Sequence, residues 1–296
     1  MKSIYYILFS MRPAQAILKN GFVLAALLFA QKLTDKNALF LSMFAYVLFC
    51  ILSGCVYLIN DVLDKREDEA NPEKKDRPVA SGKLNKNIAL IAALILACLS
   101  LLAAFRIDFQ FAIVASTYLL IGAIYSIYLK KIVIVDAVVV GVGFILRAVA
   151  GAVVINVEIS HWLLACTLLL ALFLAFTKRR YELSHLKNIS IPHRKVLERY
   201  SIRLLDQIMA VTTSATLVTY LLYTMESEVI TKFNTKYLNL TMPFVLYGIF
   251  RYLYLVYKKG EGGRPGKTLL SDMPLLATVF LWTLAVILII YFLPFR

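Results

Sequence analysis

Three aspartates in the first third of the chain have the spacing of a metal site. Asp61, Asp64 and Asp68 lie three and then four residues apart, directly after the apolar run 38–59. If a helix continues past that run, this spacing places the three carboxylates on one face. Carboxylates so close together repel one another unless a cation lies among them. Hard oxygen ligands suit Mg²⁺, whose coordination is usually completed by water and substrate phosphates. The spacing therefore predicts that Asp61, Asp64 and Asp68 are the ligands of a magnesium–phosphate site.

A solvated, charge-rich loop is the alternative for the same stretch. Residues 61–86 carry seven acids and seven bases, so their net charge is zero, as in many surface loops. Against that, seven of the chain's 18 acids fall in this one segment, and the aspartates adjoin the end of an apolar run. Lys74 and Arg77 of the same segment are candidates for phosphate binding, since Arg favours bidentate contacts with phosphate. We expect the metal–phosphate role.

A second charged segment, 178–206, differs from the first in sign. Between Lys178 and Arg203 it has eight bases and two acids. Lys178 and Arg179 directly follow an apolar run and are candidates for phosphate binding. Glu182 lies four residues after Lys178, where it is placed to orient that side chain through an ion pair. The alternative is the ordinary excess of basic residues on the cytoplasmic side of a membrane protein.

The composition indicates a polytopic membrane protein. Of 296 residues, 60% are hydrophobic and 17% are charged, and the mean hydropathy is +0.76. A soluble domain of this size does not need so much apolar sequence. The cysteines at 50, 55, 98 and 166 lie inside apolar runs, so no disulfide framework is implied. The N-terminus lacks the pattern of a cleavable signal peptide.

Nine apolar stretches have about the length needed to cross roughly 30 Å of hydrocarbon. They are residues 14–31, 38–59, 87–105, 109–129, 132–155, 162–176, 207–224, 240–257 and 274–293. Lys19 and Asn20 interrupt the first, and the sixth is short. The pattern predicts an all-α membrane protein, a bundle of nine transmembrane helices. We expect one integral-membrane domain, 1–296, in which segments 60–86 and 178–206 cap a common cavity.

The basic residues orient this bundle. With the N-terminus in the cytoplasm, 23 Lys and Arg residues lie in cytoplasmic segments and six lie in segments on the other side. This asymmetry fits the positive-inside rule, so we expect the N-terminus and both charged segments to face the cytoplasm and the C-terminus to lie outside. It also explains the net charge of +14 without a nucleic-acid partner.

Polar residues inside or beside the spans are further candidates. Arg147 lies 15 residues into its span, where a charged side chain costs about 2.5–3.5 kcal/mol, so it should face the bundle interior with a partner. A buried ion pair is the structural alternative to a substrate contact. Lys19, near the inner end of the first span, and Tyr125 and Lys130, at the end of the fourth, are candidates for binding donor or acceptor phosphates. Arg251 is close enough to its span's cytoplasmic end to snorkel.

The motif Asn60-Asp61-x-x-Asp64-x-x-x-Asp68 at the end of the second span resembles that of the UbiA superfamily of intramembrane prenyltransferases. Its members bind a polyprenyl diphosphate through Mg²⁺ at Asp-rich loops, and most have a second Asp-rich motif at the inner end of the sixth span. This chain has Lys178-Arg179 there instead, which is similar to the branch of decaprenyl-phosphate phosphoribosyltransferases. The stretches that match this branch are Arg12-Pro13 with Lys19-Asn20, 57–82, 146–148 with Gly151, Lys178-Arg179 with Glu182-Leu183, and Arg251-Tyr252.

This resemblance implies a Mg²⁺-dependent glycosyltransferase. It would move 5-phosphoribose from phosphoribosyl diphosphate (PRPP) to a polyprenyl phosphate of the decaprenyl type and release diphosphate. Asp61 and Asp64 would hold the metal at the reaction centre, and Asn60 and Tyr125 would orient donor oxygens. The product would enter cell-envelope biosynthesis at the bacterial inner (plasma) membrane, with the active site facing the cytoplasm. A homo-oligomer is compatible with this reading.

Two other functions fit parts of the sequence. A UbiA-type prenyltransferase would move a polyprenyl chain from its diphosphate to an aromatic acceptor, and the departure from the second Asp-rich motif counts against it. A transporter would use Arg147 as a charged site inside the membrane. Against a transporter, the polar residues concentrate at the inner face and no inverted repeat is apparent.

Overall fold

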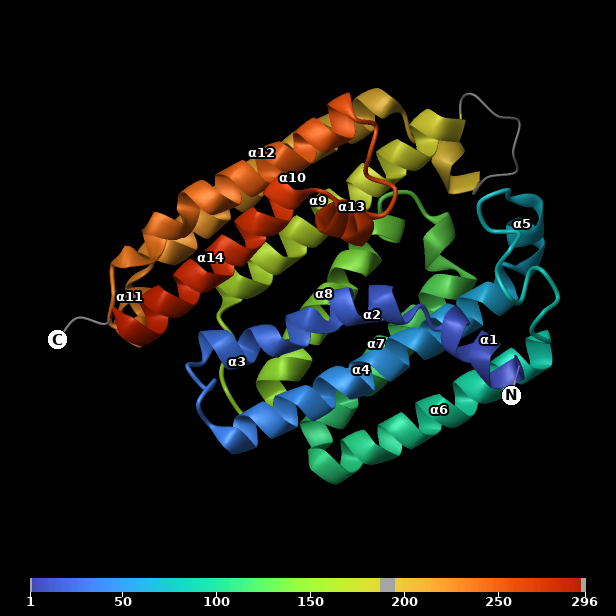
Figure 1. The fold of residues 1–296 in the computed structure, drawn as a ribbon, viewed down its shortest axis with the longest axis horizontal. Helices are drawn as coiled ribbons and strands as arrows, with labels where there is room; N and C mark the ends of the chain where they lie inside the picture. Colours follow the sequence, from blue (N-terminus) through green and yellow to red (C-terminus); the bar gives the residue numbers. More distant parts are fainter. Residues whose placement is uncertain (1, 187–194, 294–296) are drawn as a thin grey trace. The chain divides into compact units, whose positions relative to one another are not determined.

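The structure is a computed structural model that describes residues 2–186 and 195–293. The regular elements of that part of the chain are all helices, as the sequence predicts, and Figure 1 labels them. The chain folds into two compact units. Residues 1–159 with 186–199 form the first, and residues 160–185 with 200–296 form the second. A single domain spanning 1–296 stays a prediction.

The first unit contains the larger number of elements. They are α1 (Lys2–Ser10), α2 (Pro13–Asn20), η1 (Gly21–Leu24), α3 (Ala25–Phe29), α4 (Lys36–Leu63), α5 (Lys65–Ala70), α6 (Lys86–Ile107), α7 (Phe109–Ile127), η2 (Leu129–Lys131), α8 (Val135–Val154) and η3 (Lys195–Arg199). In the second unit they are α9 (His161–Leu186), α10 (Ile202–Met225), α11 (Ser227–Phe233), η4 (Tyr237–Thr241), α12 (Met242–Lys258), α13 (Pro265–Ser271) and α14 (Met273–Phe292).

Eight helices in the described part of the chain are long and apolar enough to cross a membrane: α4, α6, α7, α8, α9, α10, α12 with η4, and α14. They coincide with eight of the nine predicted spans, so the chain is a multi-pass membrane protein. The other predicted span, 14–31, is divided into α2, η1 and α3. α9 continues to Leu186, well beyond the predicted end at Phe176. Lys178 and Arg179 therefore lie on a helix, whereas the sequence predicts a cytoplasmic loop that begins at residue 178.

Polar side chains fix where several of these helices begin. Asp35 accepts hydrogen bonds from the backbone N–H groups of Asn37 and Ala38 at 3.0 and 3.1 Å, at the start of α4. Equivalent bonds at the starts of α6, α7, α10 and α14 are accepted by Asn85, Asp108, Ser201 and Asp272. Because the first N–H groups of a helix have no partner within it, such caps are most valuable beside hydrocarbon, which offers no hydrogen bonds.

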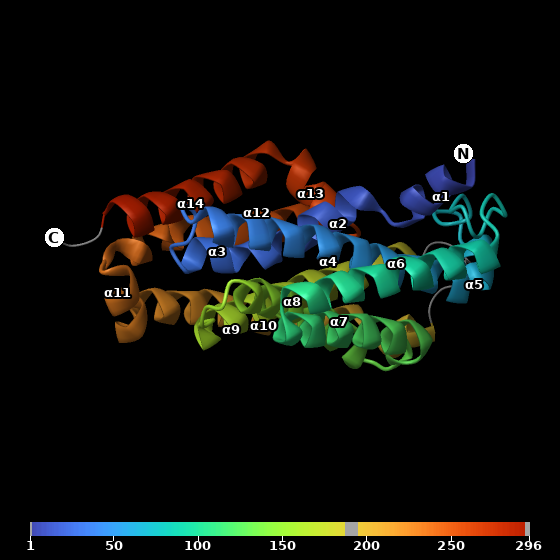
Figure 2. The same ribbon diagram turned by 90° about the horizontal axis from the view of Figure 1, so that it is seen from below.

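Small residues allow α4 and α6 to lie close together in the first unit. Ala89, Ala93 and Ala97 recur every four residues on one face of α6 and share a buried cluster with Cys55 and Leu58 of α4. Figures 1 and 2 show the two helices side by side. Close backbone approach through small residues is the usual way in which helices associate in membranes, where lipid removes the hydrophobic driving force.

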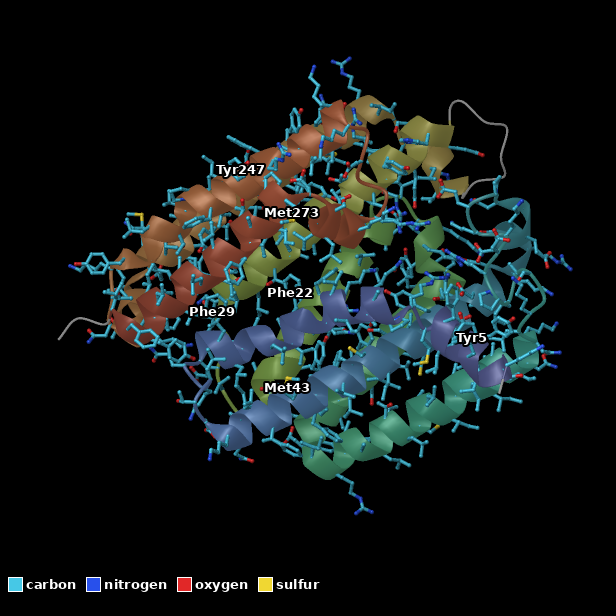
Figure 3. All side chains as sticks on the ribbon, in the orientation of Figure 1. Tyr5, Phe22, Phe29, Met43, Tyr247 and Met273 are labelled. Carbon is cyan, nitrogen blue, oxygen red and sulfur yellow. The ribbon has the colours of Figure 1, made fainter. Side chains whose placement is uncertain are left out.

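Large apolar side chains cover the outer faces of the helices (Figure 3). Tyr5, Met43, Tyr247 and Met273 are between 44 and 70% exposed. They come from α1, α4, α12 and α14, so both units present such surfaces. Large apolar side chains that are exposed on both units fit contact with lipid, as expected of membrane-spanning helices.

The interrupted first segment passes very close to α8. In η1 the carbonyl oxygen of Val23 lies against Gly151, where any Cβ atom would overlap it. Val23 is fully buried at this contact. Glycine at position 151 therefore sets how closely α8 and the first segment approach.

We expect Gly151→Ala to lower the stability of the folded protein, because the new methyl group meets a backbone carbonyl that has no free rotation. Overpacking of this kind costs about 1–3 kcal/mol. Gly21→Ala is the matched control, since a Cβ there has no heavy atom within 4 Å. Thermal unfolding of both variants in detergent tests this, and equal midpoints for the two would contradict the close packing.

Candidate active site

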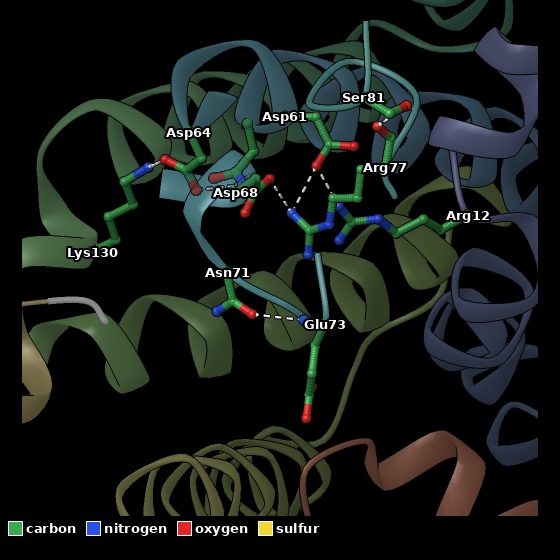
Figure 4. A network of polar contacts seen from close by, with 10 residues as sticks. Arg12, Asp61, Asp64, Asp68, Asn71, Glu73, Arg77, Ser81 and Lys130 are labelled. Carbon is green, nitrogen blue, oxygen red and sulfur yellow. Dashed lines mark hydrogen bonds and ion pairs between the residues drawn. The ribbon is translucent and has the colours of Figure 1, made fainter. Parts of the chain in front are cut away.

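Three buried carboxylates lie at the end of α4. This helix ends at Leu63, and Asp64 joins it to α5. The N–H of Asp68 donates to the carbonyl of Asp64 at 2.8 Å, so the helical course continues through the junction. The residues Asp61, Asp64 and Asp68 are 2, 5 and 3% exposed. Figure 4 shows the three side chains gathered around this junction. Charges buried to this degree need partners, because removing a carboxylate from water costs several kcal/mol.

Two arginines neutralise Asp61 and Asp68 (Figure 4). Arg77 donates from Nη1 to Asp61 Oδ1 at 3.1 Å and to Asp68 Oδ2 at 2.6 Å. Arg12 forms an ion pair with the same Oδ1 atom of Asp61. The structure therefore brings the predicted Arg77 to the carboxylates and adds a second guanidinium from the N-terminal segment.

Lys130 neutralises the third carboxylate. Its ammonium group forms an ion pair with Asp64 Oδ1, and each of these side chains is only 6% exposed. Asn60 donates from Nδ2 to Asp64 Oδ2 at 2.9 Å, so in this structure Asn60 orients a carboxylate. Tyr125 lies half-buried near the end of α7, five residues before Lys130. Its contact with a donor oxygen stays a prediction.

The turn after α5 holds Arg77 in position. Ser81 donates from its hydroxyl to the Arg77 carbonyl at 2.9 Å. Earlier in the turn, Asn71 Oδ1 accepts from the N–H of Glu73 at 3.0 Å, and the Asn71 carbonyl accepts from the N–H of Lys74 at 2.9 Å. Lys74 is half-buried in this turn, and its role in phosphate binding stays a prediction.

Arg12 is the site residue that the sequence did not single out. It lies between α1 and α2 in a left-handed conformation, with φ at 52°. Its guanidinium carbon is 4.9 Å from the centroid of the Tyr57 ring, and Lys19 Nζ donates to the hydroxyl of the same tyrosine at 3.1 Å. Burial lowers the pKa of Arg12, and the charge of Asp61 opposes that shift. The only sequence signal for Arg12 is the resemblance at residues 12–13.

Arg147 lies in a network of neutral groups in the interior of the first unit. Its guanidinium donates to Asn20 Oδ1 at 2.7 Å, to the Gly143 carbonyl at 2.6 Å and to Tyr118 Oη at 2.7 Å, with Ser53 Oγ at 3.3 Å. Arg147 is 5% exposed, so the prediction that it faces the interior with a partner is confirmed. Within the described residues no carboxylate forms an ion pair with it. Its role in substrate binding stays a prediction.

The second unit places Lys178 and Arg179 on α9, where both pair with one acid. Arg179 Nη1 lies 2.8 Å from Glu182 Oε2, and Lys178 Nζ lies 3.8 Å from Glu182 Oε1, which confirms the predicted pairing of Lys178. The next residue, Arg180, pairs with Asp206 at 2.5 Å. Their binding of substrate phosphate stays a prediction.

Arg251 is held by a carboxylate of its own unit. Its Nε and Nη2 atoms donate to Asp272 Oδ1 and Oδ2 at 3.0 and 2.8 Å, which is the bidentate arrangement that guanidinium groups favour. Asp272 also caps α14 through the N–H of Leu275. This ion pair joins α12 to the start of α14, and the expectation that Arg251 snorkels stays a prediction.

The donor set at the end of α4 suits Mg²⁺, although its oxygens are in ion pairs. In the part of the chain that the structure describes, no three His, Cys, Asp or Glu side chains converge in a metal-binding arrangement. Asp61, Asp64 and Asp68 nevertheless offer only hard carboxylate oxygens, which is the ligand chemistry of this ion. Arg12, Arg77 and Lys130 therefore supply the positive charge that a metal would bring.

Comparison with known proteins identifies the family over most of the chain. The model of the UbiA prenyltransferase family matches residues 20–284. The chain belongs to this family. The decaprenyl-phosphate phosphoribosyltransferase of Corynebacterium glutamicum is 30% identical to it over 290 residues, which cover 96% of this chain and 86% of that protein. The protein of the same name from Mycolicibacterium smegmatis is 30% identical over 255 residues, or 84% and 80% of the two chains. The predicted superfamily is confirmed, and these relatives represent the predicted branch.

Solved structures of other proteins share the fold. A UbiA homolog from Archaeoglobus fulgidus, bound to GPP and Mg²⁺, matches with a TM-score of 0.71 and 16% identity over 95% of this chain and 99% of that one. A structure of digeranylgeranylglyceryl phosphate synthase matches with a TM-score of 0.69 and 19% identity over 97% and 98%. At such identities the likeness concerns the fold alone.

We expect Tyr118→Phe to destabilise the protein, because it removes the hydroxyl that accepts from Arg147 and lies 3.0 Å from Ser53 Oγ. A buried polar group left without its partner costs about 1–3 kcal/mol. Tyr128→Phe is the matched control, because Tyr128 is 60% exposed. The measurement is the midpoint of thermal unfolding, and a Tyr118→Phe protein as stable as the control would show that this network does not hold the unit together.

Proposed function

We propose that this protein is a membrane-embedded glycosyltransferase that moves 5-phosphoribose from PRPP to a polyprenyl phosphate of the decaprenyl type. A phosphate oxygen of the lipid bonds to C1 of the ribose while the bond from C1 to the diphosphate breaks, and diphosphate leaves. The observation that carries this proposal is the 30% identity, over 96% of the chain, with a decaprenyl-phosphate phosphoribosyltransferase.

The charges of two segments support this pair of substrates. The α4–α5 junction carries three aspartates. On α9, where most members of the superfamily have a second Asp-rich motif, this chain has Lys178 and Arg179. The only acid in residues 177–186 is Glu182, which is paired with both of these bases. An allylic diphosphate bound through two metal sites needs carboxylates in both places. PRPP and a lipid phosphate bring more negative charge, which one carboxylate site and one basic segment offset better.

We assign Mg²⁺ to the carboxylates at the end of α4. Asp61 and Asp64 would hold the ion, and Asp68 would be a third ligand, either directly or through water. When bound there, Mg²⁺ stabilises the charge of the departing diphosphate. Asn60 keeps Asp64 oriented through the hydrogen bond at 2.9 Å. Arg77 binds diphosphate oxygens, for which the planar guanidinium is suited.

The remaining candidates bind phosphate oxygens of the donor or the acceptor. They are Lys19, Lys74, Tyr125, Lys130, Arg147, Lys178 and Arg179. A phosphate monoester is already ionised near neutral pH, since its second pKa is about 6. The acceptor therefore needs positioning and charge compensation, and no strong general base is required.

We place the enzyme in the bacterial inner (plasma) membrane, with its N-terminus and the carboxylate cluster facing the cytoplasm. The distribution of 23 basic residues against six supports this orientation. It requires nine crossings, and residues 13–29 are the first of these. They are helical throughout α2, η1 and α3 and extend about 25 Å at 1.5 Å per residue. A homo-oligomer remains compatible with this arrangement.

Membranes containing the protein, supplied with ribose-labelled PRPP, polyprenyl phosphate and Mg²⁺, are expected to form an organic-soluble labelled product. Its mass should equal that of the lipid phosphate plus one phosphoribosyl group. The alternative is prenyl transfer to an aromatic acceptor, in keeping with the name of the UbiA prenyltransferase family. Under that alternative the ribose label stays in the aqueous phase and a labelled prenyl diphosphate is consumed instead.

Asp61→Asn should reduce this transfer at least about a hundredfold, the size of effect seen when one electrostatic group is removed from an active site. Asp76→Asn is the matched control, because Asp76 is an exposed acid of the same segment. Initial rates with purified proteins of equal thermal stability provide the measurement. Full activity of Asp61→Asn would remove the site assignment.

A topology reporter distinguishes nine crossings from eight. With a cytoplasmic N-terminus, nine crossings put residues after Phe292 outside the cytoplasm. Alkaline phosphatase fused after Phe292 should therefore be active, and a fluorescent protein that folds only in the cytoplasm should be dark there. The opposite pair of signals would mean that residues 13–29 do not cross the membrane.

A further inference from the structure

Two guanidinium groups share one carboxylate oxygen at the end of α4. Arg12 and Arg77 both contact Asp61 Oδ1, and Arg77 also contacts Asp68. Asp61 is 2% exposed, whereas the side chains of the two arginines are 22 and 24% exposed. Both arginine side chains are thus partly exposed, whereas the carboxylate that they share is buried (Figure 4).

The position of Arg12 is fixed by its neighbours. Met11 packs against Gly54 of α4 so closely that a Cβ at position 54 would overlap it. The Tyr57 ring, one turn further along α4, lies under the guanidinium of Arg12. Arg12 is therefore held beside Asp61 by contacts that do not depend on the ion pair itself, and its charge stays near the carboxylates if that pair opens.

These ion pairs change the free energy that a divalent cation gains when it binds to the carboxylates of Asp61, Asp64 and Asp68. A cation that binds Asp61 Oδ1 without an anion must displace Arg12 or Arg77 from that oxygen, and the displaced guanidinium then loses part or all of its counter-charge in a partly buried place. A cation that enters with diphosphate brings anionic oxygens, to which a planar guanidinium can transfer its hydrogen bonds. The second route keeps every charge paired.

We propose that Arg12 is a substrate-binding residue that exchanges partners, leaving Asp61 for diphosphate oxygens when the divalent cation and diphosphate bind together. Arg77 makes the same exchange. Cation and diphosphate then bind cooperatively, and neither binds well alone. This inference rests on the proposed function only in requiring a donor that carries diphosphate, so it does not depend on which group is transferred.

The test measures binding of Mn²⁺, as a paramagnetic substitute for Mg²⁺, to the full-length protein in detergent, with and without inorganic diphosphate. In wild type, diphosphate should tighten Mn²⁺ binding about tenfold, within the usual range of coupling between two ligands. In Arg12→Gln, Mn²⁺ alone should bind several-fold more tightly, because a competing charge is gone. The enhancement by diphosphate should fall by about as much.

The two changes have opposite signs, which a loss of folding would not produce. Arg66→Gln is the matched control, since Arg66 is an exposed base on α5 in the same segment and should leave both values unchanged. Arg12→Lys keeps the charge and should retain the weak binding of Mn²⁺ alone. If Arg12→Gln does not fold, Arg77→Gln carries the same expected pair of changes.

Unchanged or weaker binding of Mn²⁺ alone to the folded Gln variant would overturn the exchange. So would equally tight Mn²⁺ binding to wild type with and without diphosphate. Failure of the ribose-label assay, in contrast, would overturn the proposed transfer and leave these binding results as they are.

Discussion

Neutralising three buried carboxylates at the end of a membrane helix is the constraint on which the first unit depends. Each isolated charge would cost several kcal/mol to bury, so the surrounding chain has to supply cations. It does so from three separate segments. Arg12 comes from the entry to α2, Arg77 from the turn after α5, and Lys130 from the turn after α7. The ion pairs of the candidate active site thus also fix where these three segments lie against the end of α4.

The interior of the same unit solves a different problem with neutral groups. Arg147 distributes its charge over Asn20, Ser53 and Tyr118, which come from α2, α4 and α7. A guanidinium can be kept charged in this way because each hydrogen bond is charge-assisted. The network ties α8 to those three helices, and α4 is the helix that carries the aspartates. This network therefore helps to fix the position of α4, and with it the carboxylate cluster, although the network and the cluster share no residue.

Much of this arrangement follows from sequence because it depends on local pattern. Hydropathy located the eight long spans, and the cost of a charge in hydrocarbon predicted that Arg147 faces inward. The counter-ions were harder to predict. Arg12 and Lys130 lie 49 and 66 residues from their carboxylates, and only packing brings them there. The interruption of the first apolar stretch was visible at Lys19 and Asn20, after which α2 ends, but the contact of η1 with Gly151 of a distant helix was not predictable from local pattern. The end of α9 was placed too early because the helix carries charged residues after Phe176, and hydropathy alone predicts a loop for such a stretch.

The chemistry of the carboxylate cluster bears on how the enzyme selects its donor. Aspartates with a divalent cation, flanked by guanidinium groups, recognise diphosphate, and a prenyl diphosphate and PRPP both carry that group. This cluster therefore cannot by itself distinguish the two donors. PRPP differs in its second phosphate and its polar ribose, so selectivity requires further cations and hydrogen-bonding groups. We propose Lys178 and Arg179 of α9 for this role; Arg179 is 4% exposed and is paired with Glu182, while the Lys178 side chain is 47% exposed. Under the function proposed above, a basic segment of this kind would favour PRPP over a prenyl diphosphate, because PRPP carries one more phosphate group.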